Sequence, residues 1–179
     1  MVPEDQPFFD AAGAIYFRAA EGGSNFIYRR KAGSLERERI LTDPILELVA
    51  VSPDGRWVVT AQVDPHDPDG RAAIVAQPYG GGPAVTLCRG YCGAAWSRDG
   101  SAFALYTDVM GEDRTMIAPV PTGRAFPVLP PAGGEMRLAM EGAKGTRVLE
   151  GDWVPGPRAG LYVSQRRSVH RNLYRIPLQ

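Results

Sequence analysis

The stretch Leu48-Val-Ala-Val-Ser-Pro-Asp-Gly-Arg-Trp-Val-Val-Thr60 decides the fold of this chain. Two short apolar runs flank Ser-Pro-Asp-Gly, in which Pro53 presets φ, Asp54 can bond the backbone ahead and Gly55 accepts a positive φ. Two β-rich runs joined by such a turn predict a tight antiparallel hairpin.

The same pattern recurs along the chain at a regular distance. Gly93-Ala-Ala-Trp-Ser-Arg-Asp-Gly-Ser-Ala-Phe-Ala-Leu105 aligns with it, so that Gly100 follows Gly55 by 45 residues. A degenerate earlier copy runs from Phe8 to Phe17, and its Gly13 precedes Gly55 by 42 residues. A period of about 40–45 residues is the size of one four-stranded propeller blade.

Further strands complete each copy. Third strands are predicted at 25–30, 72–77 and 115–120, and fourth strands at 35–40, 84–87 and 125–129. The segment 35–40 has helical propensity, but its place in the repeat predicts an outer strand. In a weaker fourth copy, Leu161–Ser164 and Asn172–Leu178 match the second and third strands.

These units predict an all-β chain, with residues 1–179 forming one β-propeller region. It has three clear four-stranded blades and a partial fourth, after an insertion at 131–150. The predicted blades cover residues 8–42, 45–88, 91–130 and 150–179.

Composition and charge exclude several classes of protein. Twenty Lys and Arg balance twenty Asp and Glu, and the basic stripe of a nucleic-acid-binding protein is absent. The cluster of Arg166, Arg167 and Arg171 is interpreted as a solvated hairpin, with an anion site as the alternative. No window reaches the ~18 apolar residues of a membrane helix, so no membrane segment is expected. Many tight turns account for the 21 Gly and 16 Pro.

The repeat resembles that of TolB-type β-propellers. The resemblance is carried by an apolar strand, Ser-Pro-Asp-Gly, a second strand, then Asn25-Phe-Ile-Tyr28 and the glycine turn at 80–82. Similar repeats occur in propellers of prolyl-oligopeptidase-like enzymes and in bacterial kinase sensor modules. The resemblance implies a module of a larger bacterial protein, and favours an extracytoplasmic location.

The number of blades leaves the closure of the ring open. Blade faces pack against neighbours, and members of this family usually close with six to eight blades. The chain is interpreted as the terminal part of a larger propeller. A compact four-blade ring and a homodimer that completes the ring are the alternatives.

The densest acidic stretch is Asp64-Pro-His-Asp-Pro-Asp-Gly70. Asp64, Asp67 and Asp69 offer oxygens to a hard cation such as calcium, and Gly70 permits a sharp turn. The spacing does not fit an EF-hand loop, and a proline-rich hairpin connection explains the same residues. The hairpin is the preferred interpretation, and no cofactor other than calcium is suggested.

Cys88 and Cys92 enclose three residues and are expected in the crossover between the second and third blades. A disulfide that ties this crossover is one interpretation, and two buried thiols are the other. A zinc site or a Cys-x-x-Cys redox motif is not supported by the spacing.

Catalytic residues are not evident. His66 and His170 are expected in surface hairpins, and no Gly-x-Ser-x-Gly nucleophile elbow is present. Trp57, Trp96 and Trp153 are expected in blade packing, with some aromatic residues available to a ligand at the propeller mouth.

The sequence therefore predicts a non-catalytic module for protein interaction or ligand sensing, with a protein or small ligand at the loop face. The hairpins that would contribute to that face lie at 18–25, 63–71, 108–114 and 165–171. The alternative is the regulatory propeller of a serine peptidase or hydrolase whose catalytic domain is absent.

Overall fold

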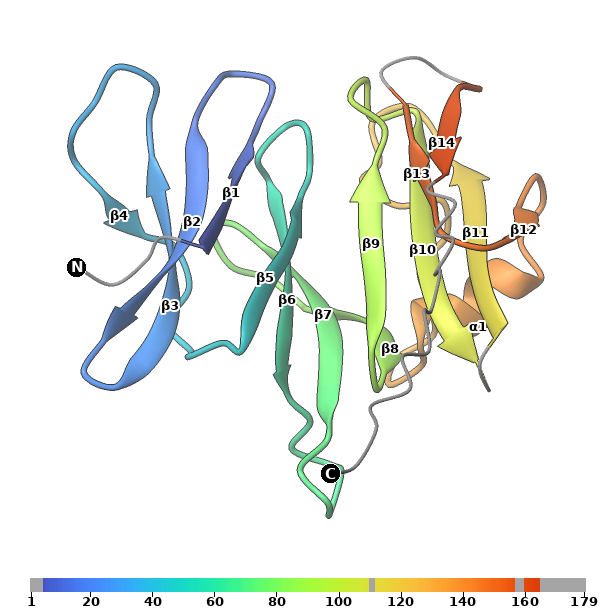
Figure 1. Ribbon diagram of the computed structural model, residues 1–179, viewed down its shortest axis with the longest axis horizontal. Coiled ribbons are helices and arrows are strands. Elements are labelled where there is room, and N and C mark those ends of the chain that lie inside the picture. The colour runs from blue at the N-terminus through green and yellow to red at the C-terminus, as the bar shows by residue number, and fades with distance from the viewer. Residues whose placement is uncertain (1–4, 110–111, 157–159, 165–179) are drawn as a thin grey trace, which may run out of the picture.

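The computed structural model describes residues 5–109, 112–156 and 160–164. Its sheets stand side by side in chain order, as Figure 1 shows. Blade 1 consists of β1 (Asp5–Phe9), β2 (Ile15–Glu21), β3 (Ser24–Arg30) and β4 (Glu38–Arg39). Blade 2 consists of β5 (Glu47–Val51), β6 (Trp57–Val63), β7 (Ala72–Pro78) and β8 (Val85–Arg89).

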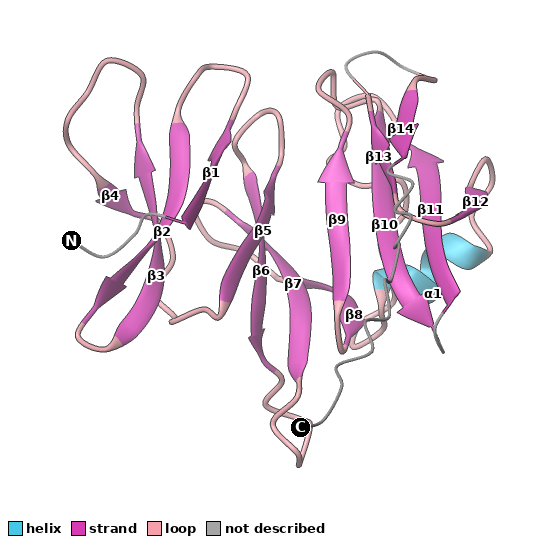
Figure 2. Ribbon diagram, viewed as in Figure 1, coloured by secondary structure: helices cyan, strands magenta, loops and turns pink. Residues whose placement is uncertain are grey.

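Blade 3 and blade 4 complete the described part of the chain. Blade 3 consists of β9 (Cys92–Trp96), β10 (Ala102–Val109), β11 (Glu112–Pro119) and β12 (Arg147–Glu150). Blade 4 is a two-stranded sheet of β13 (Trp153–Pro155) and β14 (Tyr162–Ser164). All pairings are antiparallel, and strands dominate the described residues, which confirms the all-β propeller architecture (Figure 2).

The repeated Ser-x-Asp-Gly segments form the same turn in blades 2 and 3. The Ser52 hydroxyl donates to Asp54 (2.6 Å) and accepts from the Trp57 N–H (2.9 Å). In blade 3, Ser97 makes the equivalent bonds with Asp99 (2.7 Å) and the N–H of Ala102 (2.9 Å). One serine thus closes each turn and aligns the strand that follows.

The fourth strand of blade 3 lies elsewhere than predicted. Residues 125–129 form no strand; instead β12 pairs with β11, with Leu149 opposite Thr115. Phe126 is buried between blades 2 and 3, and Pro127 has no N–H to donate to a ladder. The predicted limit of blade 3 at residue 130 is therefore wrong. The sheet extends to Glu150, and the segment 131–150 lies within the blade rather than between blades.

That segment contains α1 (Met136–Glu141), the one helix among the described residues. Its Met136 and Met140 are fully buried and join the main core with Leu87 of β8. At six residues, α1 is too short to cross a membrane, and no other described segment is helical.

The outer edge of blade 1 confirms a strand within the predicted segment 35–40, shortened to β4. Arg39 lies over the ring of Phe26, 3.4 Å from its centroid, and Arg37 lies 4.7 Å from that of Tyr28. These arginines cover aromatic side chains on the face of blade 1 that points away from blade 2. Of the fourth copy, Leu161–Ser164 contains β14, whereas Asn172–Leu178 falls outside the described residues.

Candidate functional site

The first strands of the four sheets, β1, β5, β9 and β13, are neighbours along the inner side of the array. Their ends and turns line a cavity of about 770 Å³, here called the inner-strand cavity. Its lining includes Phe9, Val51, Trp96, Arg98, Val154 and Val163. All four blades contribute, and the volume lies in the range of ligand-binding clefts.

Exposed apolar side chains surround this cavity. Phe9 is 61% exposed, Val163 55% and Val154 44%, although each belongs to a strand. Arg98 lies exposed on the same wall and has no ion-pair partner among the described residues. An apolar surface beside an unneutralised cation suits a ligand with an apolar body and an acidic group.

A buried polar network supports one wall of the cavity. Asp10 accepts hydrogen bonds from the Ala14 N–H (2.9 Å) and the Tyr16 hydroxyl (3.1 Å), and Arg29 lies 3.8 Å away. The Tyr16 hydroxyl also lies 3.2 Å from the Gly55 carbonyl oxygen, and so joins blade 1 to blade 2. Burial, with a contribution from Asp10, raises the pKa of Tyr16 to about 12, so its phenol stays neutral near physiological pH.

The acidic hairpin lies at the other end of the strands, between β6 and β7. Asp64 is buried, and its carboxylate accepts from the His66 backbone N–H (2.9 Å). Arg71 pairs with Asp67 (3.0 Å) and with Asp69 (3.2 Å). The three carboxylates are thus engaged by backbone or arginine donors. In the described part of the chain no three metal-ligating side chains form a group that could hold an ion.

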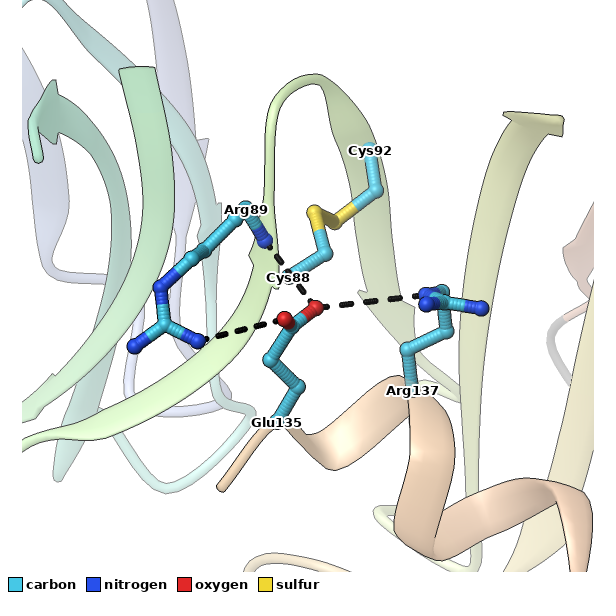
Figure 3. The surroundings of a disulfide bond; sticks show 5 residues. All are labelled: Cys88, Arg89, Cys92, Glu135 and Arg137. Carbon is cyan, nitrogen blue, oxygen red and sulfur yellow. Dashed lines mark hydrogen bonds and ion pairs between the residues drawn. A yellow bond between two sulfur atoms is a disulfide. The ribbon is translucent and has the colours of Figure 1, made fainter. Parts of the chain in front are cut away.

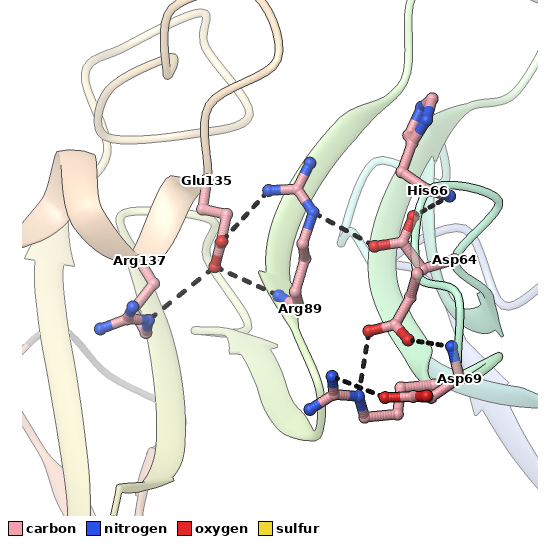
Figure 4. A network of polar contacts seen from close by, with 8 residues as sticks. Asp64, His66, Asp69, Arg89, Glu135 and Arg137 are labelled. Carbon is pink, nitrogen blue, oxygen red and sulfur yellow. Dashed lines mark hydrogen bonds and ion pairs between the residues drawn. The ribbon is translucent and has the colours of Figure 1, made fainter.

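Arg89 brings the acidic hairpin and the cysteine loop together (Figure 4). Its Nε lies 3.1 Å from Asp64, and its Nη1 lies 3.2 Å from Glu135, the residue before α1. The backbone N–H of Arg89 also donates to Glu135 (3.1 Å), and Arg137 lies 3.9 Å from the same carboxylate. The hairpin, the crossover and the helix are therefore joined through one guanidinium.

Cys88 and Cys92 form a disulfide, with Cα atoms 6.4 Å apart (Figure 3). Both side chains are buried, whereas Tyr91 between them is 74% exposed. Because Arg89 belongs to the same short loop, the bridge helps to fix the backbone from which Arg89 contacts Glu135. This end of the molecule is therefore cross-linked by one disulfide and by the ion pairs of Arg89.

The structure does not assemble a nucleophile with a base in the part that it describes. The His66 side chain is exposed on the hairpin, while His170 falls outside the described residues, as do Arg166, Arg167 and Arg171. Sequence reasoning missed Arg89 and Glu135, which are 46 residues apart. It also missed Arg98, and the available signal was its position as the second residue of the turn Ser97-Arg-Asp-Gly100.

Comparison with models of protein families and with curated protein sequences found no match. Among solved structures, TolB from Acinetobacter baumannii is similar, with a TM-score of 0.51 and 22% identity over 69% of this chain. A putative TolB from Agrobacterium tumefaciens has a TM-score of 0.49 and 20% identity; it matches 69% of this chain, which covers 44% of that protein. The β-propeller domain of the Trilobed protease from Pyrococcus furiosus has a TM-score of 0.48 and 12% identity, over 66% of this chain and 39% of that one.

The chain covers only 31% of the Acinetobacter TolB. At 22% identity the likeness shows the fold and leaves the activity and partners open. The described chain therefore has the fold of a run of TolB-like β-propeller blades.

Proposed function

We propose that this chain is a non-catalytic binding module that holds an apolar segment of a partner protein against the inner-strand cavity. The observation that carries the proposal is the exposure of Phe9, Val154 and Val163 around a cavity to which all four blades contribute. Binding sites of propellers lie on their loop faces, where turns of successive blades meet. Arg98 would pair with an acidic group of the bound segment.

The cross-links at the other end of the blades support a binding role. Interblade contacts, the disulfide and the Arg89 network hold the opposite end of the blades in place. A preformed surface binds a partner with little loss of its own conformational entropy. No described group is placed for covalent chemistry, so specificity would come from shape and charge.

Site-specific photo-crosslinking tests the proposal in cells of the source organism. A photoreactive amino acid at Phe9 is expected to yield a defined protein adduct. The same residue at Leu35, which is 93% exposed on a distant loop, serves as the matched control. Identical adducts from both positions, or none from position 9, would contradict the proposal. Mass spectrometry of the adduct distinguishes a second copy of this chain from a different protein.

A binding measurement with the identified partner then tests the chemistry. Phe9→Ser and Arg98→Glu are expected to weaken binding, and circular dichroism checks that both variants keep the wild-type fold. If Phe9→Ser weakens binding and Arg98→Glu does not, the apolar contact stands and the proposed ion pair with Arg98 is refuted.

A further inference from the structure

Blade 1 and blade 4 are the two ends of the described array, and each has one face on which no other described blade packs (Figure 1). Every other blade face lies against a neighbour, as is usual in a repeat array. The two end faces differ in what covers them.

The outward face of blade 1 carries an aromatic cluster that is buried without a neighbouring blade. Phe17, Phe26 and Tyr28 form it, and all side chains that pack in the cluster belong to blade 1. The guanidinium of Arg39 lies over Phe26, and that of Arg37 lies over Tyr28. These two arginines, here called the arginine lid, cover rings that would otherwise face solvent.

Hydrogen bonds and an ion pair hold Arg39 in this position. Its Nε donates to the carbonyl oxygen of Leu41 (3.0 Å). Its Nη1 lies 3.9 Å from the carboxylate of Glu21, which also accepts from the Tyr28 hydroxyl. The lid is therefore bonded to blade 1 itself.

The other blades carry no charge at the position of Arg39. This residue lies opposite Tyr28 of the third strand, and the same strand register gives Thr86 in blade 2 and Val148 in blade 3. The arginine is therefore a feature of blade 1 and not of the repeat.

The outward face of blade 4 is apolar and uncovered. In each blade a backbone hydrogen bond to a carbonyl at the start of the second strand closes the hairpin, and Val163 is the second residue after that carbonyl. The same count gives Tyr16, Val59 and Ala104 in the other blades, and all three are fully buried on the side of the next blade. Val163 is instead 55% exposed and pairs with the exposed Val154. The position that a next blade covers elsewhere is open here.

The two end faces are of the two kinds that meet wherever successive blades pack. Blade 4 of one copy could therefore pack on blade 1 of another, and such a head-to-tail contact repeats into rings or filaments. A docking blade would have to displace the arginine lid or bury it, and burial of a charge without a partner is costly. The strands Trp153–Pro155 and Tyr162–Ser164 contain no carboxylate that could pair with the lid.

We propose that Arg37 and Arg39 prevent the open face of blade 4 in a second copy of this chain from docking on blade 1. Phe9 lies opposite Ile15, at the inner end of the same face of blade 1, and remains exposed. The lid thus leaves the inner-strand cavity accessible, and its role does not depend on the function proposed for that cavity.

Sedimentation velocity over a range of protein concentrations tests the lid. Arg37→Ser/Arg39→Ser is expected to associate reversibly, with a mean mass that rises with concentration to at least that of a dimer, whereas the wild type should show no such rise. Arg56→Ser/Arg124→Ser removes the same charge from exposed turns and is the matched control. A lid variant that sediments as this control does, or a wild type that associates as strongly as the lid variant, would overturn the proposal.

A charge on blade 4 identifies the surface that the association uses. Val163→Glu, added to the lid variant, is expected to restore the monomer, because its carboxylate would be buried in an apolar contact. Val63→Glu, at a valine of similar exposure at the end of β6, is the control and should leave the association unchanged. Association that survives Val163→Glu would refute docking through blade 4.

Circular dichroism and thermal melting check that the lid variant keeps the wild-type fold. Arg37→Ser alone leaves the hydrogen-bonded Arg39 in place and should associate less than the double variant. If the double variant does not fold, Arg37→Ser is compared with Arg56→Ser, and equal sedimentation of these two refutes the lid.

The two proposals can fail separately. Reversible association of the lid variant, with no photo-crosslinked adduct from position 9, supports the lid and contradicts the function proposed for the inner-strand cavity. A defined adduct, with a lid variant that stays monomeric, has the opposite meaning.

Discussion

The interface between blades 1 and 2 and that between blades 2 and 3 are built on the same repeat by different chemistry. At the first, an apolar cluster is joined by a polar network in which Asp10 contacts Tyr16 and the half-buried Arg29, and Tyr16 meets the turn at Gly55. At the second, Trp57, Trp96, Phe103 and Phe126 pack together with centroids 5.0–5.6 Å apart. A repeat therefore specifies the strands and the turn, while each interface is completed mainly by residues at which the copies of the repeat differ.

Gly55 and Gly100 show the difference at one position. Both have a positive φ, 68° and 71°, as the turn requires. A Cβ at Gly55 would overlap the Tyr16 hydroxyl and lie 2.7 Å from Asp10 Oδ2, whereas a Cβ at Gly100 would meet nothing within 4 Å. In blade 3 only the backbone conformation requires the glycine. In blade 2 the close approach of Tyr16 and Asp10 requires it as well.

The largest effect is expected at the aromatic interface. Phe126→Ala removes a buried ring that contacts three other aromatic side chains, so the free energy of unfolding should fall by about 3–5 kcal/mol. Urea denaturation followed by tryptophan fluorescence measures the change. Leu129→Ala, at a side chain 59% exposed in the same segment, should cost less than about 1 kcal/mol. Similar losses in both variants would mean that Phe126 does not anchor the segment.

The glycine pair gives the next largest effect. Gly100→Ala should lower stability by roughly 1–2 kcal/mol through left-handed backbone strain alone. Gly55→Ala carries that strain and also the overlap with Tyr16, so it should cost about 2–4 kcal/mol. Thermal and urea unfolding of the two variants compare them directly. Equal losses would show that the close approach at Gly55 is accommodated without strain.

Tyr16→Phe isolates the polar part of the first interface. Loss of the hydrogen bonds to Asp10 and Gly55 should lower stability by about 1–2 kcal/mol at neutral pH. The variant should also lessen the cost of Gly55→Ala, because it removes the atom that the new Cβ overlaps. A double-mutant cycle measures this coupling, and strictly additive losses would refute the contact.

Alkaline titration checks the same group. The pKa of Tyr16 is raised to about 12, above the ordinary value near 10, so the native state retains a proton that the unfolded state loses. The contribution is complete below pH ~10 and disappears as the pH rises toward 12. Wild-type stability should therefore fall across this window more steeply than that of Tyr16→Phe. Part of this decline in stability should remain in Tyr16→Phe, because burial also raises the pKa of Tyr106.

A smaller effect is expected at the disulfide. The Cys88–Cys92 bridge closes a loop with a sequence separation of 4, so it should contribute about 2 kcal/mol or less. Cys88→Ala/Cys92→Ala should remain folded, with faster hydrogen exchange at residues 89–92. Complete unfolding, or exchange identical to the wild type, would contradict a local role in the second interface.

Calcium is expected to have no effect on the hairpin of blade 2. Arg89 and Arg71 pair with Asp64, Asp67 and Asp69, so millimolar calcium should leave the melting temperature unchanged. A filled site at about 100 times its dissociation constant would add roughly 2.7 kcal/mol. A clear upward shift that is lost in Asp67→Asn would restore the metal interpretation.

Much of the architecture could be predicted from local pattern. The Ser-Pro-Asp-Gly hairpin around Gly55, its copy at Gly100 and the spacing between them predict antiparallel blades, because turn chemistry and strand alternation act over a few residues. The long-range contacts of the molecule cannot be predicted from local pattern in the same way. The hairpin at Asp64 and the loop at Cys88 were recognised as separate features, and nothing local indicates that Arg89 joins them.

Only the tertiary structure decided between two segments for the fourth strand of blade 3. Residues 125–129 and Arg147–Glu150 both contain apolar side chains, but burial of Phe126 against Trp57 and Trp96 withdraws the first from the sheet. The inner-strand cavity likewise depends on how the blades pack. Turn and strand preferences are local energies that the chain carries in its sequence, whereas the partner of a buried ring or an arginine depends on contacts between residues far apart.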